Sequence, residues 1–245
     1  MKLRVMTFNI HHGKGTDRRV DLQRIVEIIA AHQCDVVGLN EVDCYFSKRS
    51  HYVDQIGWLA EALGMNHAFG HAISSPAKKR VERKRYGNAI LSRYPITFER
   101  NHVFQFPSIL MEDRSLLESH IQLPTQTLHV YNSHLSLNPW IHRKQVNYIL
   151  HHCSDHSSPT IMMGDWNMRP KSKPWKKIAY HFTDVCQAND PTMRYATFPS
   201  SRPRTQLDYI FVSRDLSVQS AEVVQSNTFA SDHLPLLTTL FLQSH

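Results

Sequence analysis

Five short polar segments, spread over nearly the whole chain, each follow a run of apolar residues. Such apolar runs, for example residues 3–6 and 160–163, are typical of buried strands. In open α/β architectures, ligands bind and catalytic side chains project where these strands end. The polar segments are Thr7-Phe8-Asn9, Leu39-Asn40-Glu41, Asn132-Ser133-His134, Gly164-Asp165-Trp166-Asn167 and Ser231-Asp232-His233.

Because these segments span residues 7–233 of 245, a single site requires nearly the entire chain, and we predict one domain over residues 1–245. The chain is 41% hydrophobic and 20% charged, which allows a substantial core. It runs directly into a predicted strand at residues 3–10, and no apolar run reaches membrane-spanning length. We therefore expect a cytoplasmic monomer without stable membrane insertion, whose reduced, buried thiols are Cys34, Cys44, Cys153 and Cys186.

The net charge of +7 and the 17 histidines have two interpretations. One is an anionic partner, and the other is that the charge simply sets solubility. Two basic stretches, residues 78–85 and 169–177, are candidates for phosphate contacts or for solvated surface loops. The second stretch follows directly after the polar segment that ends at Asn167, and this position favours a role in substrate binding.

The spacing of apolar residues predicts helices over residues 20–32 and 55–63, the latter capped by Gly64, and a third within residues 140–151. Extended segments are predicted at residues 34–39, 89–92, 96–104, 116–123, 128–131, 207–212 and 236–242. Meandering strands with a few interleaved helices indicate a layered α/β fold rather than a repeating βαβ barrel.

The acidic and amide residues of the polar segments indicate a site for a hard metal ion. Glu41, Asn9, Asp165, Asn167 and Asp232 offer oxygen donors, which suit magnesium or manganese and leave room for substrate phosphate oxygens. Taken singly, each is more often a turn former or a helix cap than a ligand. A zinc site is not indicated, since no His-Glu-x-x-His pattern occurs and the adjacent histidines at 11 and 12 would point in opposite directions on a strand.

His233 and Asp208 form a second candidate pair. A carboxylate that accepts a hydrogen bond from one imidazole nitrogen fixes the tautomer and stabilises the protonated ring, so that the other nitrogen can contact a reacting phosphate. Other hydrolase patterns are missing. Gly13-Lys14-Gly15-Thr16 lacks the glycine spacing of a phosphate-binding loop, and no Gly-x-Ser-x-Gly segment indicates a serine hydrolase.

The ordered set of motifs resembles the metal-dependent endonuclease/exonuclease/phosphatase superfamily, which includes DNase I-like nucleases, sphingomyelinases and inositol-polyphosphate 5-phosphatases. The resemblance covers essentially the full chain and implies a four-layer α/β sandwich, with two central, mainly antiparallel sheets flanked by helices. The segments that carry it are the five above, together with Tyr86-Gly87-Asn88-Ala89-Ile90-Leu91-Ser92 and Leu207-Asp208-Tyr209-Ile210-Phe211.

The resemblance also implies roles for residues at matching positions. Glu41 corresponds to the principal metal ligand, with Asn9 beside it and Asp232 completing or flanking the site. Asp165 corresponds to the residue that orients or deprotonates the attacking water, and Asn167 to one that holds a nonbridging phosphate oxygen. His233, paired with Asp208, would stabilise the charge on five-coordinate phosphorus, and His134 resembles a second phosphate-contacting histidine.

Two positions depart from the family pattern. Asn40 replaces the usual glutamine before the metal-binding glutamate, so support of Glu41 is expected to differ. Gln206 stands where a basic residue is common, which weakens a phosphate contact or shifts it to Arg204.

We therefore predict a magnesium- or manganese-dependent phosphoester hydrolase, and the basic stretches favour a nuclease acting on nucleic acid. One alternative is a phosphatase or phospholipase C-like hydrolase of inositol phosphates or phospholipid head groups, because fold and chemistry are shared among these enzymes. A noncatalytic anion-binding scaffold is the alternative from another class.

Overall fold

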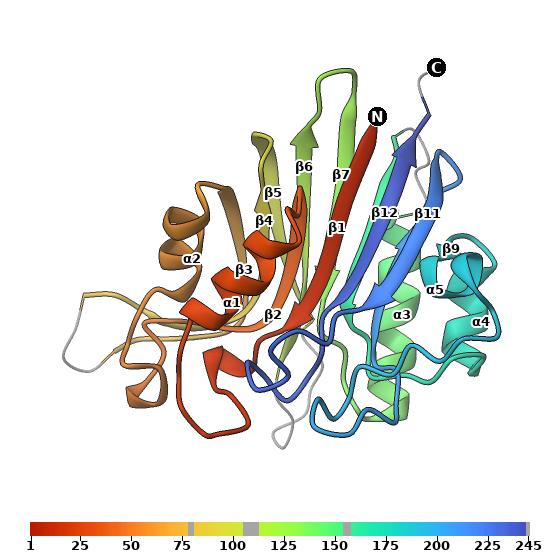
Figure 1. The fold of residues 1–245 in the computed structure, drawn as a ribbon. Coiled ribbons are helices and arrows are strands. Elements are labelled where there is room, and N and C mark those ends of the chain that lie inside the picture. The colour runs from red at the N-terminus through yellow and green to blue at the C-terminus, as the bar shows by residue number, and fades with distance from the viewer. Residues whose placement is uncertain (78–80, 105–112, 154–157, 244–245) are drawn as a thin grey trace.

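Two six-stranded sheets pack face to face in the computed structural model, which describes residues 1–77, 81–104, 113–153 and 158–243 (Figure 1). The first sheet has the order β11-β12-β1-β2-β4-β3, formed by Leu216–Val223, Leu236–Leu242, Lys2–Asn9, Val36–Cys44, Lys84–Ser92 and Asn66–Ser75. The second has the order β5-β6-β7-β8-β10-β9, formed by Ile96–Phe104, Arg114–Gln122, Thr127–Ser133, Thr160–Asp165, Asp208–Val212 and Thr183–Asp184.

Each sheet contains a parallel pair of strands near its centre, β1 with β2 and β7 with β8. The other paired strands of the two sheets run antiparallel. Parallel neighbours end at the same edge of a sheet, so the polar segments that follow β1, β7 and β8 are brought toward one another. This arrangement confirms the predicted sandwich of two mainly antiparallel sheets.

Alternation along the strands separates the two sides of each sheet. On β1, Leu3 and Val5 face the core between the sheets, whereas Met6 and Phe8 face the outer layer. The outer face of the first sheet is covered by α1 and α2, and that of the second by α3 and α4. The helical segments are η1 His11–Gly13, α1 Gln23–Ala31, η2 Lys48–Ser50, α2 Gln55–Leu63, α3 Pro139–Cys153, α4 Lys173–Ala179 and α5 Val185–Asn189.

Several predicted elements agree closely with the structure, and others need correction. Helix α2 has the predicted bounds, and Gly64 caps it in the left-handed region at φ +62°. The first helix begins at Gln23 instead of residue 20, because Val20 forms an isolated β-bridge with Lys14. Strand β2 does not end at residue 39 but continues to Cys44. Strand β11 and helix α5 were not predicted.

The two basic stretches are less loop-like than expected. Residues 84–85 belong to β4, and residues 74–75, just before the first stretch, belong to β3, so the described parts lie on a hairpin. Residues 78–80 lie outside the described residues. In the second stretch, residues 173–177 form the first part of α4.

All four cysteines are buried free thiols, as predicted. Burial raises the pKa of Cys34 to about 12, which keeps this thiol protonated and unreactive at neutral pH. Within the described part of the chain, no helix is both long and apolar enough to cross a membrane.

Gly164, immediately before Asp165, occupies a position that requires glycine. Its φ is +134°, and a Cβ atom there would lie 2.0 Å from the backbone oxygen of Ser133 on the neighbouring strand. We expect Gly164→Ala to lower the free energy of unfolding by roughly 2–3 kcal/mol, because backbone strain and a backbone clash act together. Urea unfolding measures this loss.

Gly64→Ala is the matched control for this substitution. Gly64 also has a positive φ, but no atom lies within 4 Å of the position of its Cβ. The control therefore carries the left-handed penalty alone, about 1 kcal/mol. Equal losses in the two variants would contradict the importance of the close approach of Gly164 to Ser133.

Candidate active site

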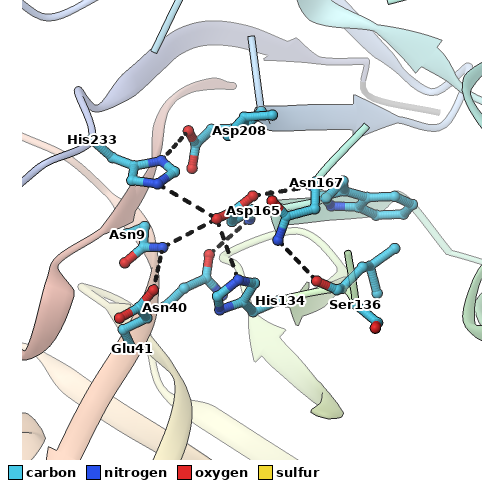
Figure 2. A network of polar contacts seen from close by, with 12 residues as sticks. Asn9, Asn40, Glu41, His134, Ser136, Asp165, Asn167, Asp208 and His233 are labelled. Atoms are coloured by element: carbon cyan, nitrogen blue, oxygen red, sulfur yellow. Dashed lines mark hydrogen bonds and ion pairs between the residues drawn. The ribbon is translucent and has the colours of Figure 1, made fainter. Parts of the chain in front are cut away.

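The predicted site residues other than Asp232 converge from both sheets around one buried carboxylate, that of Asp165 (Figure 2). Asn9 ends β1, Glu41 lies in β2 and Asp165 ends β8. Asp208 begins β10. The remaining residues lie in loops that follow β7 and β8 or precede β12, and they are His134, Asn167, Asp232 and His233.

Glu41 reaches the site through a β-bulge, not at the end of a strand as predicted. The register between β2 and β4 shifts between Leu39 and Val42, and Glu41 has φ +59°. A bulge re-aims a side chain relative to the pleat. Glu41 is half-buried, whereas the side chains on either side of it are buried. Its carboxylate is therefore accessible at the rim of an otherwise closed core.

Asp165 lies at the centre of the network. Its Oδ2 accepts a hydrogen bond from Nδ2 of Asn9 at 3.1 Å, and its Oδ1 accepts one from the backbone N–H of Asn167 at 3.1 Å. Nε2 of His134 lies 3.4 Å from Oδ2, and Nε2 of His233 lies 3.7 Å from the same oxygen. Burial raises the pKa of Asp165 to about 7, against the opposing effect of His233. A carboxylate with this pKa is suited to take up a proton near neutral pH.

His233 and Asp208 form the predicted pair. Nδ1 of His233 lies 2.9 Å from Oδ2 of Asp208, and both side chains are buried. Burial by itself would lower the pKa of His233, but the carboxylates of Asp208 and Asp165 raise it to about 10. His233 is therefore an imidazolium at neutral pH, and its second nitrogen faces the carboxylate of Asp165.

His134 differs from His233 in its charge. Burial, together with the positive charges of Arg114 and His233, holds the pKa of His134 well below its usual value. Asp165 thus lies between a neutral imidazole and a cationic one. The carboxylate of Asp165 therefore has an imidazolium, which can only donate, near one side and a neutral imidazole near the other.

Three buried amides, those of Asn40, Asn88 and Asn132, connect the two sheets next to Asp165. Asn40 Nδ2 donates to Oδ1 of Asn88 at 2.8 Å and of Asn132 at 3.2 Å. The Oδ1 of Asn40 accepts the backbone N–H of Asp165 at 2.8 Å. The residue that departs from the family pattern therefore supports Asp165 rather than Glu41. All three amides lie within the segments that resemble the family motifs, and this was the sequence signal by which they could have been identified.

A group of possible metal ligands lies beside this network. One ligand atom each of His11, His12 and Glu41 lie within 4.8 Å of one another. The expectation that the two histidines point in opposite directions is wrong, because residues 11–13 form a 3₁₀ turn in which the imidazole rings contact edge to face at 4.6 Å. Asp232 Oδ1 lies 3.6 Å from Nδ1 of His11.

The donors of this group fit a divalent cation. His12 is buried, and its Nδ1 has no hydrogen-bond partner among the described residues. Burial, then Arg49, lowers the pKa of His12 to about 4, so the ring is neutral and offers a lone pair. Asn9 is placed differently from a simple ligand, because its Nδ2 donates to Oε1 of Glu41 and its Oδ1 accepts the backbone N–H of His11. It holds the acidic groups in position.

Of the two remaining predicted positions, Asn167 lies at the site and Gln206 lies outside it. Asn167 has φ +45°, and its Nδ2 donates to the backbone oxygen of Leu135 at 2.9 Å. Gln206 is buried with its Nε2 3.5 Å from Sγ of Cys186 and takes no part in the site. Arg204 is exposed, and its backbone oxygen accepts a hydrogen bond from Arg194.

The chain is similar in sequence and in fold to several known proteins. The profile described as Endonuclease/Exonuclease/phosphatase family matches residues 6–233. YbhP of Escherichia coli K12 is 26% identical over 257 residues, covering 98% of this chain and 96% of YbhP. The crystal structure of an endonuclease/exonuclease/phosphatase from Beutenbergia cavernae has a TM-score of 0.84 and 28% identity, covering 99% of this chain and 72% of that one.

A second similar structure carries a more specific name. The mannosyl-6-phosphatase Bt3783 of Bacteroides thetaiotaomicron has a TM-score of 0.76 and 17% identity, covering 98% of this chain and 100% of that one. At this level of identity the likeness concerns the fold.

Proposed function

The chain belongs to the endonuclease/exonuclease/phosphatase family, and from this premise we propose that it hydrolyses phosphoesters with a divalent metal ion, using Asp165 to activate water. One observation carries the proposal. A single buried carboxylate, Asp165, lies between the neutral His134 and the cationic His233, and Asn9 holds it from a third side. A structural carboxylate has no need of two imidazoles aimed at the same oxygen.

Each of these residues has a separate role in the proposed hydrolysis. Asp165 accepts a proton from water as the water oxygen attacks phosphorus. His233, kept protonated by Asp208, stabilises the negative charge that grows on the phosphate oxygens. His134 and Asn167 contact other phosphate oxygens, and they orient the phosphorus for attack in line with the leaving oxygen.

Glu41 and Asp232 would hold the metal ion, with His11 and His12 as nitrogen donors and Asn9 positioning Glu41. When bound, the ion supplies a Lewis acid that neutralises charge on a phosphate oxygen. The oxygen donors suit Mg²⁺ and Mn²⁺, whereas imidazole nitrogen favours Mn²⁺ over Mg²⁺.

We expect Glu41→Gln to weaken the binding of both Mn²⁺ and Mg²⁺ by roughly 100-fold or more, because even outer-shell partners of metal ligands contribute 10–100-fold. His11→Ala should weaken Mn²⁺ binding more than Mg²⁺ binding. Isothermal titration calorimetry measures both effects. Glu27→Gln, on the exposed face of α1, is the control and should change neither affinity. Unchanged binding in Glu41→Gln would place the metal elsewhere.

Hydrolysis itself is tested with a panel of phosphoesters. The panel contains bis-p-nitrophenyl phosphate, p-nitrophenyl phosphate, single- and double-stranded DNA, RNA, sphingomyelin and inositol phosphates, each with Mg²⁺, Mn²⁺ or EDTA. The proposal expects turnover that EDTA abolishes, and a nuclease would prefer the nucleic acids, in line with the basic stretches. No turnover on any substrate would instead favour a noncatalytic anion-binding scaffold.

A further inference from the structure

A cleft of about 620 Å³ opens beside the site, between the first turns of α3 and the start of α4. Its volume falls in the range of sites that bind small organic molecules. Its apolar walls are formed by side chains from both helices and from the loops before them, namely Leu137, Pro139, Val146, Met168 and Pro174. Leu137 is 75% exposed at the opening, so an apolar surface faces solvent there.

The cleft borders the site at Asn167. Asn167 lines it, and the backbone N–H of Asn167 is the donor to Oδ1 of Asp165. His142 also lines it, and Nε2 of His142 lies 2.7 Å from the backbone oxygen of Trp166, the residue next to Asp165. Asn167 thus joins the cleft to the carboxylate of Asp165.

Cations surround the apolar walls. Arg143, Arg169, Lys173 and Lys177 line the cleft and are exposed, while none of the described residues that line it is acidic. Lys177 Nζ donates to Oδ1 of Asn147, another lining residue. The Oγ of Ser172 is buried without a hydrogen-bond partner among the described residues. The cleft thus offers apolar contact and, at its margin, several cationic side chains that could pair with an anion.

The walls favour an aliphatic group over nucleic-acid bases. Channels that bind single strands without sequence preference present aromatic side chains on which the bases stack. Of the described residues that line this cleft, none is Phe, Tyr or Trp. A nucleic acid could pair with the cations, but its bases would have no aromatic side chain among the described lining residues on which to stack.

We propose that the cleft is a substrate pocket for a small amphiphilic phosphoester, whose aliphatic part packs against the apolar walls and whose second anionic group pairs with the surrounding cations. This inference rests on the proposed hydrolase activity. It assigns the basic stretch at residues 169–177 to substrate selection, not to a nucleic-acid groove.

The first experiment varies the aliphatic group alone. Methyl, butyl and octyl p-nitrophenyl phosphate share one leaving group, so differences among them report the other ester group. In wild-type protein we expect kcat/KM to rise roughly two- to fourfold per methylene over the first few carbons, as each is removed from water. Leu137→Gln, at an exposed position, should flatten this rise, mostly through KM.

The second experiment varies the anion. An ester with a terminal carboxylate on its hexyl chain should be hydrolysed at least severalfold better than the hexyl ester. Lys173→Ala and Arg143→Ala should remove this preference. Lys176→Ala, on the same helix as Lys173 but outside the lining, is the matched control and should keep it.

The outcomes separate this inference from the activity on which it rests. If wild-type protein hydrolyses the methyl ester but kcat/KM is independent of chain length and of the carboxylate, the pocket assignment is wrong and the hydrolase stands. If the wild-type protein prefers RNA or DNA, and Lys173→Ala and Lys176→Ala reduce the hydrolysis of that nucleic acid equally, the basic surface binds a polyanion. The inference is then overturned. Failure to hydrolyse any phosphoester of the panel, with either metal ion, contradicts the proposed function itself.

Discussion

Replacing Asp165 with asparagine should lower kcat for phosphoester hydrolysis by roughly 10³–10⁴-fold, the upper range for loss of a general base. The amide matches the carboxylate in shape and can still accept the N–H of Asn167, but it cannot take a proton from water. Because burial raises the pKa of Asp165, a neutral side chain at this position removes a desolvation cost. This gain opposes the loss of the hydrogen bond that Nδ2 of Asn9 donates to Oδ2 of Asp165, so we expect the free energy of unfolding to change little. Steady-state kinetics and urea unfolding of the purified variant measure the two effects.

Asp184→Asn provides a matched control outside the site. Asp184 is also buried with a raised pKa, caused mainly by burial, and it accepts hydrogen bonds from Nε1 of Trp175 and the backbone N–H of Cys186. Its substitution should reduce stability by about 1 kcal/mol through a weakened hydrogen bond, with kcat unchanged. If Asp165→Asn behaved like Asp184→Asn, with lower stability and normal turnover, Asp165 would be a structural residue.

The contrast between these two carboxylates shows how far the sequence could identify the site. Asp165 follows the apolar run at residues 160–163, whereas Asp184 follows Phe182 and Thr183. Asp165 is predicted as a site residue from its place at the end of that run, and Gly164 and Asn167 around it also match an ordered family motif. The local reason for that motif is visible only in the structure, where Gly164 allows the close approach of Ser133 and Asn167 adopts a positive φ.

The errors in the predicted site have a physical cause. Periodicity assumes a regular strand, so it placed Glu41 at a strand end and set the two histidines at 11 and 12 on opposite faces. A β-bulge adds one residue without changing composition, and a 3₁₀ turn brings adjacent side chains to one side. Neither feature leaves a signature in the order of apolar and polar residues.

Fold prediction was strongest for some of the longer elements. Strands β5 and β12 and helix α2 have the predicted bounds, since each combines clear periodicity with a defined end such as Gly64. Helix α5, which has only five residues, is held by tertiary contacts and by the cap from Asp184. Short segments carry too few residues for periodicity to be recognised.

Asp208→Asn should lower kcat at neutral pH by roughly 10²–10³-fold, as expected for the loss of one preorganised electrostatic contact to the transition state. Asp208 and Asp165 together raise the pKa of His233 to about 10, against the effect of burial. Without the Asp208 carboxylate, burial lowers the pKa of His233, and the ring loses its proton at lower pH. The alkaline limb of the kcat–pH profile should therefore move to lower pH, in step with the His233 pKa measured by NMR.

Glu118→Gln is the control for this experiment, because it removes a comparable histidine–carboxylate pair away from the site. Nε2 of His102 lies 2.7 Å from Oε2 of Glu118, and neither residue contacts the Asp165 network. This variant should leave both kcat and its pH profile unchanged. Should Asp208→Asn lower kcat by the same factor at every pH, Asp208 would act by holding the imidazole in place and not by keeping it protonated. If His233 of the wild-type protein titrated near its ordinary pKa, the electrostatic role assigned to the pair of His233 and Asp208 would be wrong.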